Sequence, residues 1–567
     1  MTGPTANLSG TPSTSVTDAP AGMKDSAPDQ AHDMHALGGV LAAAIRIVAS
    51  LTLVSRLTGL VRDVLTAGLF GDTAVGSAFN AGFQIPNIFR RLFGEGALSA
   101  AFLPEYTTLR KNSPDAADQL ASLTLRALTL TTALIVVVVE LALMGVLFWG
   151  NNSPDLVLSI RLVMLMLPMM PMVCTTAILG GVLQSHGKFG PPAAAPVILN
   201  VMMIAAAFVP LIWKGIPKET SAYLVGASAV AASILQIVWS VVALRGLVRW
   251  TRLTSAARDS AKRVLGRFLP VLLGLGTLQL NTMMDTLIAM WPFWVGTTVF
   301  GHEVTLDKSS NSILSYASRL YQFPLGVFGI AVATAVFPLL SKTAGHSVAF
   351  VDVLRRGVRL SLFIGIPASI GLVVVREDLV RTMFWRFTPE GIDRSALVVA
   401  CFAPAVWAYS LNHVLTRAFY ARGDTVTPMR VAVTMVGANL TLNLILIWYL
   451  REAGLALSTG LCAMAQALIV AWVARTKLQA NVFDRATLIA SAKILVVSFL
   501  MGAAVWATVE FWPTPTNWRT SFLRLSIATI VGGLGYGVLT FVCRLEELRW
   551  LVRRAPAGVK MESMMAE

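Results

Sequence analysis

Five arginines lie inside segments that are otherwise apolar and long enough to cross a membrane: Arg56, Arg62, Arg90, Arg91 and Arg319. One charged side chain at the centre of a bilayer costs about 2.5–3.5 kcal/mol, so several together oppose insertion by roughly 10 kcal/mol or more. The chain can retain them only where they face a water-filled interior or an anionic partner. Guanidinium groups form paired hydrogen bonds with phosphate and keep their proton. These residues therefore predict a buried cationic cavity that suits a diphosphate or another polyanion.

Two polar residues accompany the first pair of arginines. Ser55 directly precedes Arg56, and Asp63 directly follows Arg62. Residues seven apart share a helix face, so Arg56 and Asp63 point the same way. We expect Ser55 and Asp63 to line the cavity with the arginines. The alternative is that Arg56 and Asp63 form an internal ion pair that fixes helix packing.

A polar stripe at helical spacing marks the next apolar segment. It consists of Asn80, Gln84, Asn87, Arg91 and Glu95, with Arg90 beside it. Lipid cannot satisfy such a stripe, so it must face the protein interior. We expect Asn87, Arg90 and Arg91 to contact the ligand, and an Arg91–Glu95 ion pair is the alternative. No acid stands at helical spacing from Arg62, Arg90 or Arg319 on an interior face, which favours binding roles for these three.

A second constellation lies in the C-terminal half. Asp285 is the only acid in its apolar segment, Asn439 and Asn443 lie four apart on one helix face, and Thr459 follows in the next segment. One carboxylate with amide and hydroxyl oxygens suits a hard cation such as Na⁺. Hydrogen bonding between helices explains the same amides without an ion. Both interpretations stay open.

The elements that position these residues must be membrane-spanning helices. Of the 567 residues, 55% are hydrophobic and only 13% are charged, too few for the surface of a soluble domain of this size. Apolar runs of about 20 residues recur along the chain and predict about fourteen spans. The net charge of +15 is concentrated in alternate loops. That is the positive-inside pattern rather than a nucleic-acid surface, and it predicts that both termini are cytoplasmic.

The chain also repeats itself. The stretch from Phe93-Gly94 resembles the one from Phe328-Gly329, and Gly187 with Pro192 matches Gly423 with Pro428, in both cases at an offset of about 235 residues. We predict two six-helix lobes related by a pseudo-twofold axis along the membrane normal, plus two extra helices. The predicted segments are a disordered cytoplasmic tail at 1–37, an N-terminal lobe at 38–246, a basic linker at 247–264, a C-terminal lobe at 265–476, an extra helix pair at 487–544 and a basic cytoplasmic tail at 545–567.

The sequence contains no pattern typical of catalysis. Its four cysteines are scattered without metal spacing, and we find no Walker-type glycine loop and no nucleophile with a plausible base. We therefore expect neither an enzyme nor a cofactor, apart from a candidate Na⁺ coupling ion.

Four stretches carry a resemblance to a known family: SRLTGLVRD, FNAGFQIPNIFRRLFGEGALSAAFLPEY, SRLYQFPLGVFGIAVATAVFPLLSK and AFYARGDTVTPMR. They resemble the MurJ family of lipid II flippases, in the multidrug/oligosaccharidyl-lipid/polysaccharide exporter superfamily. The resemblance extends over residues 40–544. It implies fourteen helices, two lobes and a central cationic cavity, and it implies that the last two helices line a groove for the undecaprenyl tail.

The resemblance also assigns residues. Arg56, Arg62, Arg90 and Arg319 match the family's cavity arginines, and Asp63 matches their partner acid. Three positions depart from the pattern: many relatives carry Asp where this chain has Ser77 and Ser318, and some carry an acid at Asn443 in a sodium site. The resemblance therefore implies a cavity more cationic than usual.

The function that follows is translocation of lipid II, the undecaprenyl-diphosphate-linked peptidoglycan precursor, from the cytoplasmic to the outer leaflet of the bacterial plasma membrane. The expected partners are lipid II, membrane lipids and the cell-wall synthesis machinery. The alternatives are a cation-coupled drug exporter, a polysaccharide-repeat flippase and a non-transporting scaffold of the cell-wall machinery.

Overall fold

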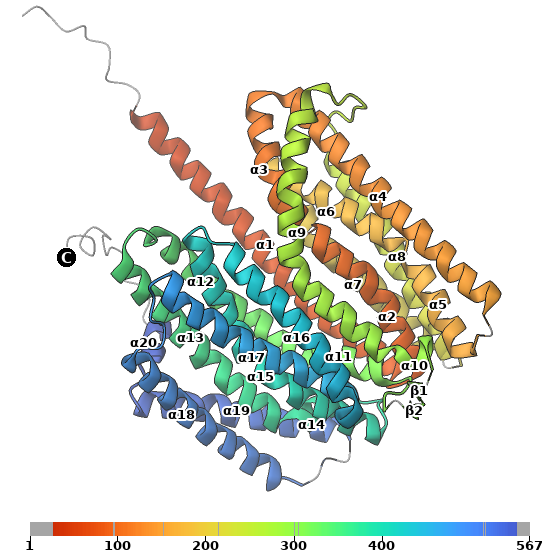
Figure 1. The fold of residues 1–567 in the computed structure, drawn as a ribbon, viewed down its shortest axis with the longest axis vertical. Coiled ribbons are helices and arrows are strands. Elements are labelled where there is room, and N and C mark those ends of the chain that lie inside the picture. Colours follow the sequence, from red (N-terminus) through yellow and green to blue (C-terminus); the bar gives the residue numbers. More distant parts are fainter. Residues whose placement is uncertain are drawn as a thin grey trace, which may run out of the picture.

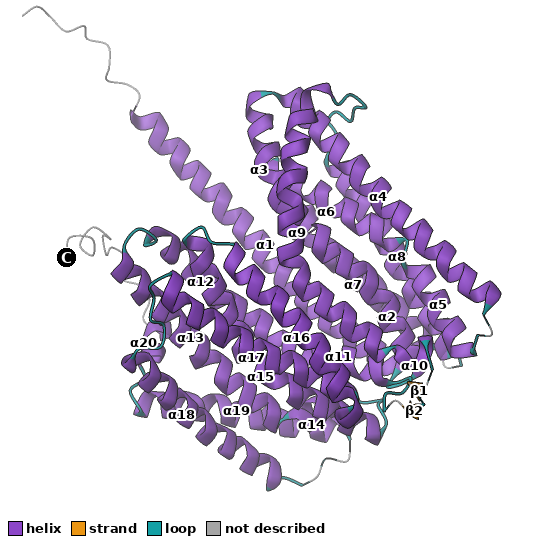
Figure 2. Cartoon of the chain, in the orientation of Figure 1, coloured by secondary structure: helices purple, strands orange, loops and turns teal. Residues whose placement is uncertain are grey.

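Helices form nearly the whole chain because lipid offers the backbone no hydrogen-bond partners, so each apolar segment must satisfy its own. The computed structural model describes residues 27–552 except 95, 96, 151, 214, 297, 300, 304, 514 and 516. Within that part, β-structure is confined to a hairpin of β1 (Thr298–Val299) and β2 (His302–Glu303), which pair antiparallel (Figure 2). The tail predicted at residues 1–37 and the one at 545–567 lie largely outside the described residues.

The first half of the chain forms one lobe (Figure 1). Its helices are α1 (Ala27–Phe70), α2 (Ala74–Phe89), the π-helical segment η1 (Arg90–Gly94), α3 (Ala97–Asn112), α4 (Pro114–Trp149), α5 (Pro154–Met166), α6 (Met169–Ser185), α7 (Gly190–Ile212) and α8 (Lys218–Ala243). We call α1 to α8 the N-lobe. A connection with a short 3₁₀ turn, η2 (Ser255–Ala257), leads to the second half.

The second half begins with α9 (Arg258–Ala289) and α10 (Trp291–Trp294). It continues through α11 (Ser310–Pro324), the π-helical segment η3 (Leu325–Gly329), α12 (Ile330–Lys342), α13 (Ser347–Val374), α14 (Arg376–Met383), α15 (Pro389–Ala421), α16 (Val426–Leu450), α17 (Glu452–Lys477), α18 (Arg485–Glu510), α19 (Trp518–Val542) and α20 (Glu546–Val552). We call α11 to α20 the C-lobe. The helix α9 contacts both lobes, since it packs against α3 and also against α16.

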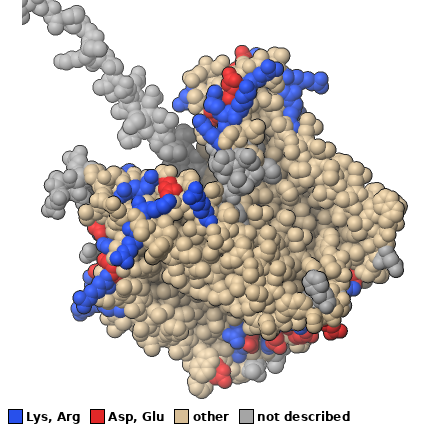
Figure 3. Space-filling model, viewed as in Figure 1, with Lys and Arg blue, Asp and Glu red and all other residues tan. Residues whose placement is uncertain are grey.

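Eleven helices or near-continuous helix pairs in the described part are long and apolar enough to cross a membrane. Three further pieces, α1, α2 with α3, and α9, run beside them (Figure 1). The space-filling view shows a wide band with few charged side chains between two charged ends (Figure 3). The prediction of a polytopic, all-helical membrane protein of about fourteen spans is therefore confirmed.

The internal repeat reappears in the backbone. The two π-helical segments begin at Arg90 and Leu325, 235 residues apart. Gly187 and Gly423 have φ angles of 76° and 79°, and each follows the end of a long helix. Positive φ is cheap only for glycine, so both turns need that residue. Two unusual backbone features at one offset support a duplicated origin for the halves.

The two ends of the bundle differ in charge. Lys and Arg side chains gather where α3 ends and α9 begins, and where α12 ends (Figure 3). We call this the basic end. The opposite end, where α5 and α11 begin, we call the sealed end for reasons given below.

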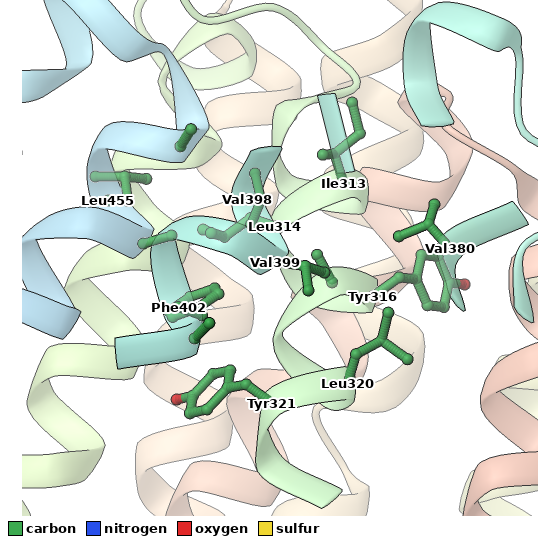
Figure 4. Close-up of a cluster of buried hydrophobic side chains, with 14 of the residues drawn as sticks. Ile313, Leu314, Tyr316, Leu320, Tyr321, Val380, Val398, Val399, Phe402 and Leu455 are labelled. Carbon is green, nitrogen blue, oxygen red and sulfur yellow. The ribbon is translucent and has the colours of Figure 1, made fainter. Parts of the chain in front are cut away.

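The core of the C-lobe sets the orientation of α11. Tyr321 is buried against α15, where it stacks on Phe402 with ring centroids 4.4 Å apart (Figure 4). Tyr316 is buried against the rings of Phe384 and Phe387, which follow α14. Arg319 lies two positions from Tyr321 and therefore roughly opposite to it around the helix, so Arg319 is turned toward the N-lobe, where it reaches Asp63.

The last two transmembrane helices, α18 and α19, are joined to the rest of the C-lobe by polar contacts at three levels. Arg524 on α19 forms two hydrogen bonds of 2.7 Å with Asp378 on α14, and both side chains are buried. Tyr536 donates a 2.7 Å hydrogen bond to the carbonyl of Phe363 on α13. At the basic end, Arg359 on α13 pairs with Glu547 on α20 at 2.5 Å. The pair is therefore fixed to α13 and α14.

Candidate substrate-binding site

A cavity of about 650 Å³ lies between the two lobes. Its walls come from α1, α2, η1, α3, α6, α7 and α8 of the N-lobe, from α9, and from α11 of the C-lobe. All eight residues predicted to bind substrate line it: Ser55, Arg56, Arg62, Asp63, Asn87, Arg90, Arg91 and Arg319. The structure thus brings together residues that are up to 264 positions apart in the chain.

The cavity is strongly cationic. Its lining contains five arginines and one acid, Asp63, which gives a formal charge of +4. Four of the arginines belong to the N-lobe, on α1 and η1, and only Arg319 belongs to the C-lobe. Like charges gathered at low dielectric repel one another, so an anionic ligand would lower the free energy of this site.

Asp63 connects the two lobes inside the cavity. Its Oδ1 accepts hydrogen bonds from Arg62 Nη2 at 2.7 Å and Nε at 3.1 Å, and its Oδ2 lies 3.8 Å from Nε of Arg319. The sequence alternative, an ion pair between Arg56 and Asp63 on one helix face, is not the arrangement found. The acid is instead shared by its chain neighbour and by an arginine of the other lobe, which helical spacing within one segment cannot indicate.

Asn200 on α7 holds Arg62 in place, and the sequence analysis missed it. Its Oδ1 accepts a 2.8 Å hydrogen bond from Arg62 Nη1, while its Nδ2 donates to the carbonyl of Ser55 at 3.0 Å. The ring of Phe83 lies 5.0 Å from the guanidinium carbon of Arg62, which is a cation–π distance. A lone asparagine in an apolar helix was the available signal.

Arg56 reaches across to the C-lobe. A Cβ atom placed on Gly326 in η3 would overlap Nη1 of Arg56 and stand 3.3 Å from its Cζ. The guanidinium therefore lies against backbone that only glycine leaves open. This contact pairs an arginine of the N-lobe with the π-helical segment of the C-lobe.

The arginines of η1 sit where the helix widens. Arg90 and Arg91 are the first residues of the π-helical segment, and Arg90 Nε donates a 3.2 Å hydrogen bond to Asn87. Single π-helical turns within α-helices are frequent at functional sites. Glu95, the alternative partner of Arg91, lies outside the described residues.

One end of the space between the lobes is closed by hydrogen bonds. Ser312 donates from its backbone N–H to Ser77 Oγ at 2.9 Å and from its hydroxyl to the carbonyl of Gly71 at 2.7 Å, while Asn311 donates to the carbonyl of Ser77. Asp155 pairs with Lys308 just outside this contact. Arg386 and Thr388 of the C-lobe add hydrogen bonds to the carbonyl of Gly68 and to Asp72 at the same end.

Ser77 and Ser318 therefore differ in role. Ser318 lines the cavity, whereas Ser77 is absent from its lining and belongs to the seal. Of these two departures from the family pattern, only Ser318 changes the charge of the cavity, so the expectation for Ser77 needs that correction.

An ionic network supports the seal from the C-lobe. Burial would raise the pKa of Asp307, but hydrogen bonds from Arg394 and Ser309 outweigh it and lower the pKa to about 2. Arg394 Nη1 lies 2.7 Å from Asp307 Oδ2, and its Nε lies 2.7 Å from the buried Glu452. The network fixes the loop that carries Lys308.

The four residues of the candidate sodium site come together where α9, α16 and α17 meet. Asn443 Nδ2 donates to Asp285 at 2.7 Å and to Asn439 Oδ1 at 3.1 Å, and Asn439 Nδ2 lies 3.5 Å from Thr459 Oγ1. Ser458, which the sequence analysis missed, donates to Asn443 Oδ1. The set offers one carboxylate with amide and hydroxyl oxygens, the chemistry that a hard cation takes. The same side chains also satisfy one another, as the hydrogen-bonding alternative requires.

Two helical lobes around a charged cavity, sealed at one end, define an alternating-access membrane transporter. The family model for the lipid II flippase MurJ matches residues 66–529. A probable lipid II flippase MurJ of Rhizobium tropici is 30% identical over 82% of this chain and 86% of its own length. One from Vibrio cholerae is 29% identical over 88% of this chain and 94% of its own. This chain therefore belongs to the MurJ family of lipid II flippases.

Solved structures agree on the fold. A lipid II flippase MurJ in an inward closed conformation superposes with a TM-score of 0.73 at 23% identity, covering 89% of this chain and 99% of that one. An inward-facing multidrug resistance transporter of the MATE family superposes with a TM-score of 0.58 at 13% identity, covering 77% and 98%.

Proposed function

We propose that this protein transports lipid II across the bacterial plasma membrane, with the diphosphate held by the arginines of the central cavity. The observation that carries the proposal is the net charge of +4 on one cavity between the lobes. A diphosphate linkage bears negative charge at the junction of sugar and lipid, and arginine recognises it through paired hydrogen bonds. A drug exporter for organic cations would need the opposite charge.

The transport cycle requires no bond to be made or broken. With the seal closed, the substrate enters from the basic end and its phosphates approach arginines of both lobes. Neutralising the repulsion between Arg319 and the arginines of the N-lobe favours states in which the lobes come together, and this shifts the population toward the occluded form. The seal then opens and releases the lipid on the other side.

The basic end faces the cytoplasm in this proposal, which puts both chain termini there. Support comes from the concentration of Lys and Arg at that end (Figure 3). Cys543, which is exposed at the end of α19, offers a test. A membrane-impermeant thiol reagent should label it in inside-out vesicles and not in right-side-out cells, with Cys543→Ser as the unlabelled control. Labelling in intact cells would reverse the orientation.

We also propose Na⁺ as a coupling ion. Asp285, Asn439, Asn443 and Thr459 would hold it and supply the oxygen ligands, with Ser458 beside them. The support is their convergence in space from three helices.

The deciding experiment follows lipid II between leaflets. A strain depleted of its own flippase is complemented with this chain, and lipid II exposed on the outer leaflet is labelled with an impermeant probe. Wild type should restore outer-leaflet lipid II, whereas Arg319→Ala, expressed at equal level, should not. Restored growth without movement of lipid II would indicate the scaffold alternative, and equal transport by both variants would refute a role for the arginine cavity.

A further inference from the structure

The connection between α8 and α9, residues 244–257, presents three arginines and two apolar side chains to the outside at the basic end. Arg245, Arg249 and Arg252 are exposed. Between and beside them, Trp250 is 43% exposed and Leu253 is 66% exposed. Exposing a tryptophan and a leucine to water is unfavourable, so their position beside three arginines indicates an interaction site.

The backbone of this connection is held rigidly by α4. The N–H groups of Arg249, Thr251 and Ala256 donate to Asp118 Oδ2 at 3.0 Å, Ser122 Oγ at 3.1 Å and Gln119 Oε1 at 3.0 Å. These three acceptors lie on one face of α4, because positions three and four apart in a helix are neighbours. The side chains of the loop are therefore carried on a fixed support.

Apolar contacts with the bundle also fix the same loop. Val248 and Ala257 are buried in the hydrophobic cluster that α3, α4 and α6 form at the basic end. With these two residues turned inward, the arginines, Trp250 and Leu253 turn outward. Ordering these side chains on binding a ligand costs less entropy than it would on a flexible loop.

The depth of the loop matches the polar layer of a bilayer. Ser122 lies five residues before Ala127, where the run of α4 without charged residues begins and continues to Val139. At 1.5 Å per residue this is roughly 8 Å, comparable to the headgroup layer of about 5–8 Å on each side of the hydrocarbon. On the other side, the loop follows Val241 and Val242, which are exposed on the apolar surface of α8.

The cations of the loop are not neutralised by nearby acids. Within the described residues, Arg245, Arg249 and Arg252 form no ion pair. The carboxylate of Asp118 accepts the backbone N–H of Arg249 and attracts its charge without forming an ion pair with its guanidinium. Farther along, Arg263 and Arg267 share Glu105. The three loop arginines are thus available to an external anion.

We propose that residues 244–257 form a binding site for acidic phospholipid headgroups, separate from the central cavity. Arg245, Arg249 and Arg252 bind the phosphate, while Trp250 and Leu253 insert between the headgroups and the acyl chains. Arginine forms paired hydrogen bonds with phosphate, and aromatic side chains are enriched at the membrane–water interface, so both features suit a phospholipid headgroup. The site would hold the basic end of the N-lobe at a fixed depth in the leaflet.

The test counts lipids bound to the purified full-length protein. The protein is exchanged into mixed micelles that contain equal phosphatidylglycerol and phosphatidylcholine, and retained lipid is measured by native mass spectrometry. Wild type should prefer phosphatidylglycerol. The triple variant R245Q/R249Q/R252Q should lose at least tenfold of that preference, and Trp250→Ala severalfold.

A matched control separates a site from general charge. R430Q/R475Q/R485Q removes the same charge from exposed positions at the same end of the C-lobe and should leave the preference unchanged. Ser122→Ala keeps every charge but removes the acceptor for Thr251, so a reduced preference would show that the rigid support matters. Equal losses in the two triple variants would overturn the proposal, because the arginines would then act only as diffuse charge. Displacement of the lipid by millimolar glycerol phosphate would also overturn it, in favour of a soluble anion.

Discussion

Arg319 of the C-lobe and Asp63 of the N-lobe face each other across the cavity, with Nε of the arginine 3.8 Å from Oδ2 of the acid. Because Arg62 occupies the other oxygen of the same carboxylate, one acid serves two arginines from different lobes. An incoming phosphate can replace Asp63 as the partner of either arginine. Binding and the approach of the lobes are thereby coupled through a single carboxylate.

Removing one cavity arginine should weaken substrate binding. We expect Arg90→Ala and Arg319→Ala each to lower the affinity for lipid II by tenfold or more, about 1.4 kcal/mol, because each loses a charge-assisted contact with phosphate. Binding to purified protein measures this, with Arg475→Ala, an exposed arginine outside the cavity, as control. Unchanged affinity in both cavity variants would remove their role.

Asn200 should act through Arg62. Asn200→Ala removes the hydrogen bond to Arg62 Nη1 and the one to the carbonyl of Ser55, a cost of about 1–3 kcal/mol, so lipid II binding should fall severalfold. Asn200→Asp should bind still more weakly, since the added carboxylate lowers the cavity charge from +4 to +3. Affinities of the two variants, with melting temperatures to show that both fold, check this order. A tighter-binding Asn200→Asp would contradict it.

A side chain at Gly326 should displace the Arg56 guanidinium from its place in the cavity. In Gly326→Ala the new Cβ overlaps Arg56, so the guanidinium must move and transport should drop by an order of magnitude. Gly437→Ala on α16 is the matched control, since nothing lies within 4 Å of its added Cβ. Leaflet-resolved transport in cells compares the two, and equal activity would show that Arg56 does not depend on this contact.

The sodium proposal gives a prediction with a definite sign. Asn443→Asp adds a second carboxylate beside Asp285, so Na⁺ should bind more tightly, whereas Asp285→Asn should abolish its effect. Titration of purified protein with NaCl at constant ionic strength, against KCl as control, measures both. Identical responses to the two salts in wild type would rule out the site.

The buried pair between α14 and α19 should contribute strongly to stability. Asp378→Ala leaves Arg524 buried without its partner, which typically costs 3–5 kcal/mol, so the melting temperature in detergent should drop clearly. Replacing both residues together, Asp378→Leu with Arg524→Met, should restore much of the loss. If the double variant is no more stable than the single one, the penalty does not come from an unpaired charge.

Much of the fold and the cavity was predictable because lipid cannot satisfy the hydrogen bonds or the charges of a membrane-spanning segment. An arginine in an apolar helix must face the protein interior or its ends, so all eight residues predicted to bind substrate could be assigned to one cavity before their contacts were known. The offset repeat likewise indicated two lobes, and both the π-helical segments and the turns at Gly187 and Gly423 follow it.

What could not be predicted depends on contacts between segments distant in sequence. Helical spacing pointed Arg56 toward Asp63, whereas the acid pairs with Arg62 and Arg319. The roles of Asn200, Gly326 and Ser458 arise from neighbours more than a dozen residues away, which local spacing does not identify. Ser77 was linked to the cavity through the family resemblance, which does not say how far along the helix that position lies from the cavity.

The uneven distribution of the arginines has a mechanical consequence. Four of the five belong to α1 and η1, and one belongs to α11. In the proposed cycle, when the lobes separate, a bound pyrophosphate stays attracted mainly to the four arginines of the N-lobe. The C-lobe then moves around a headgroup that stays bound to the N-lobe. The headgroup thus becomes exposed on the other side of the membrane with little movement relative to the N-lobe arginines.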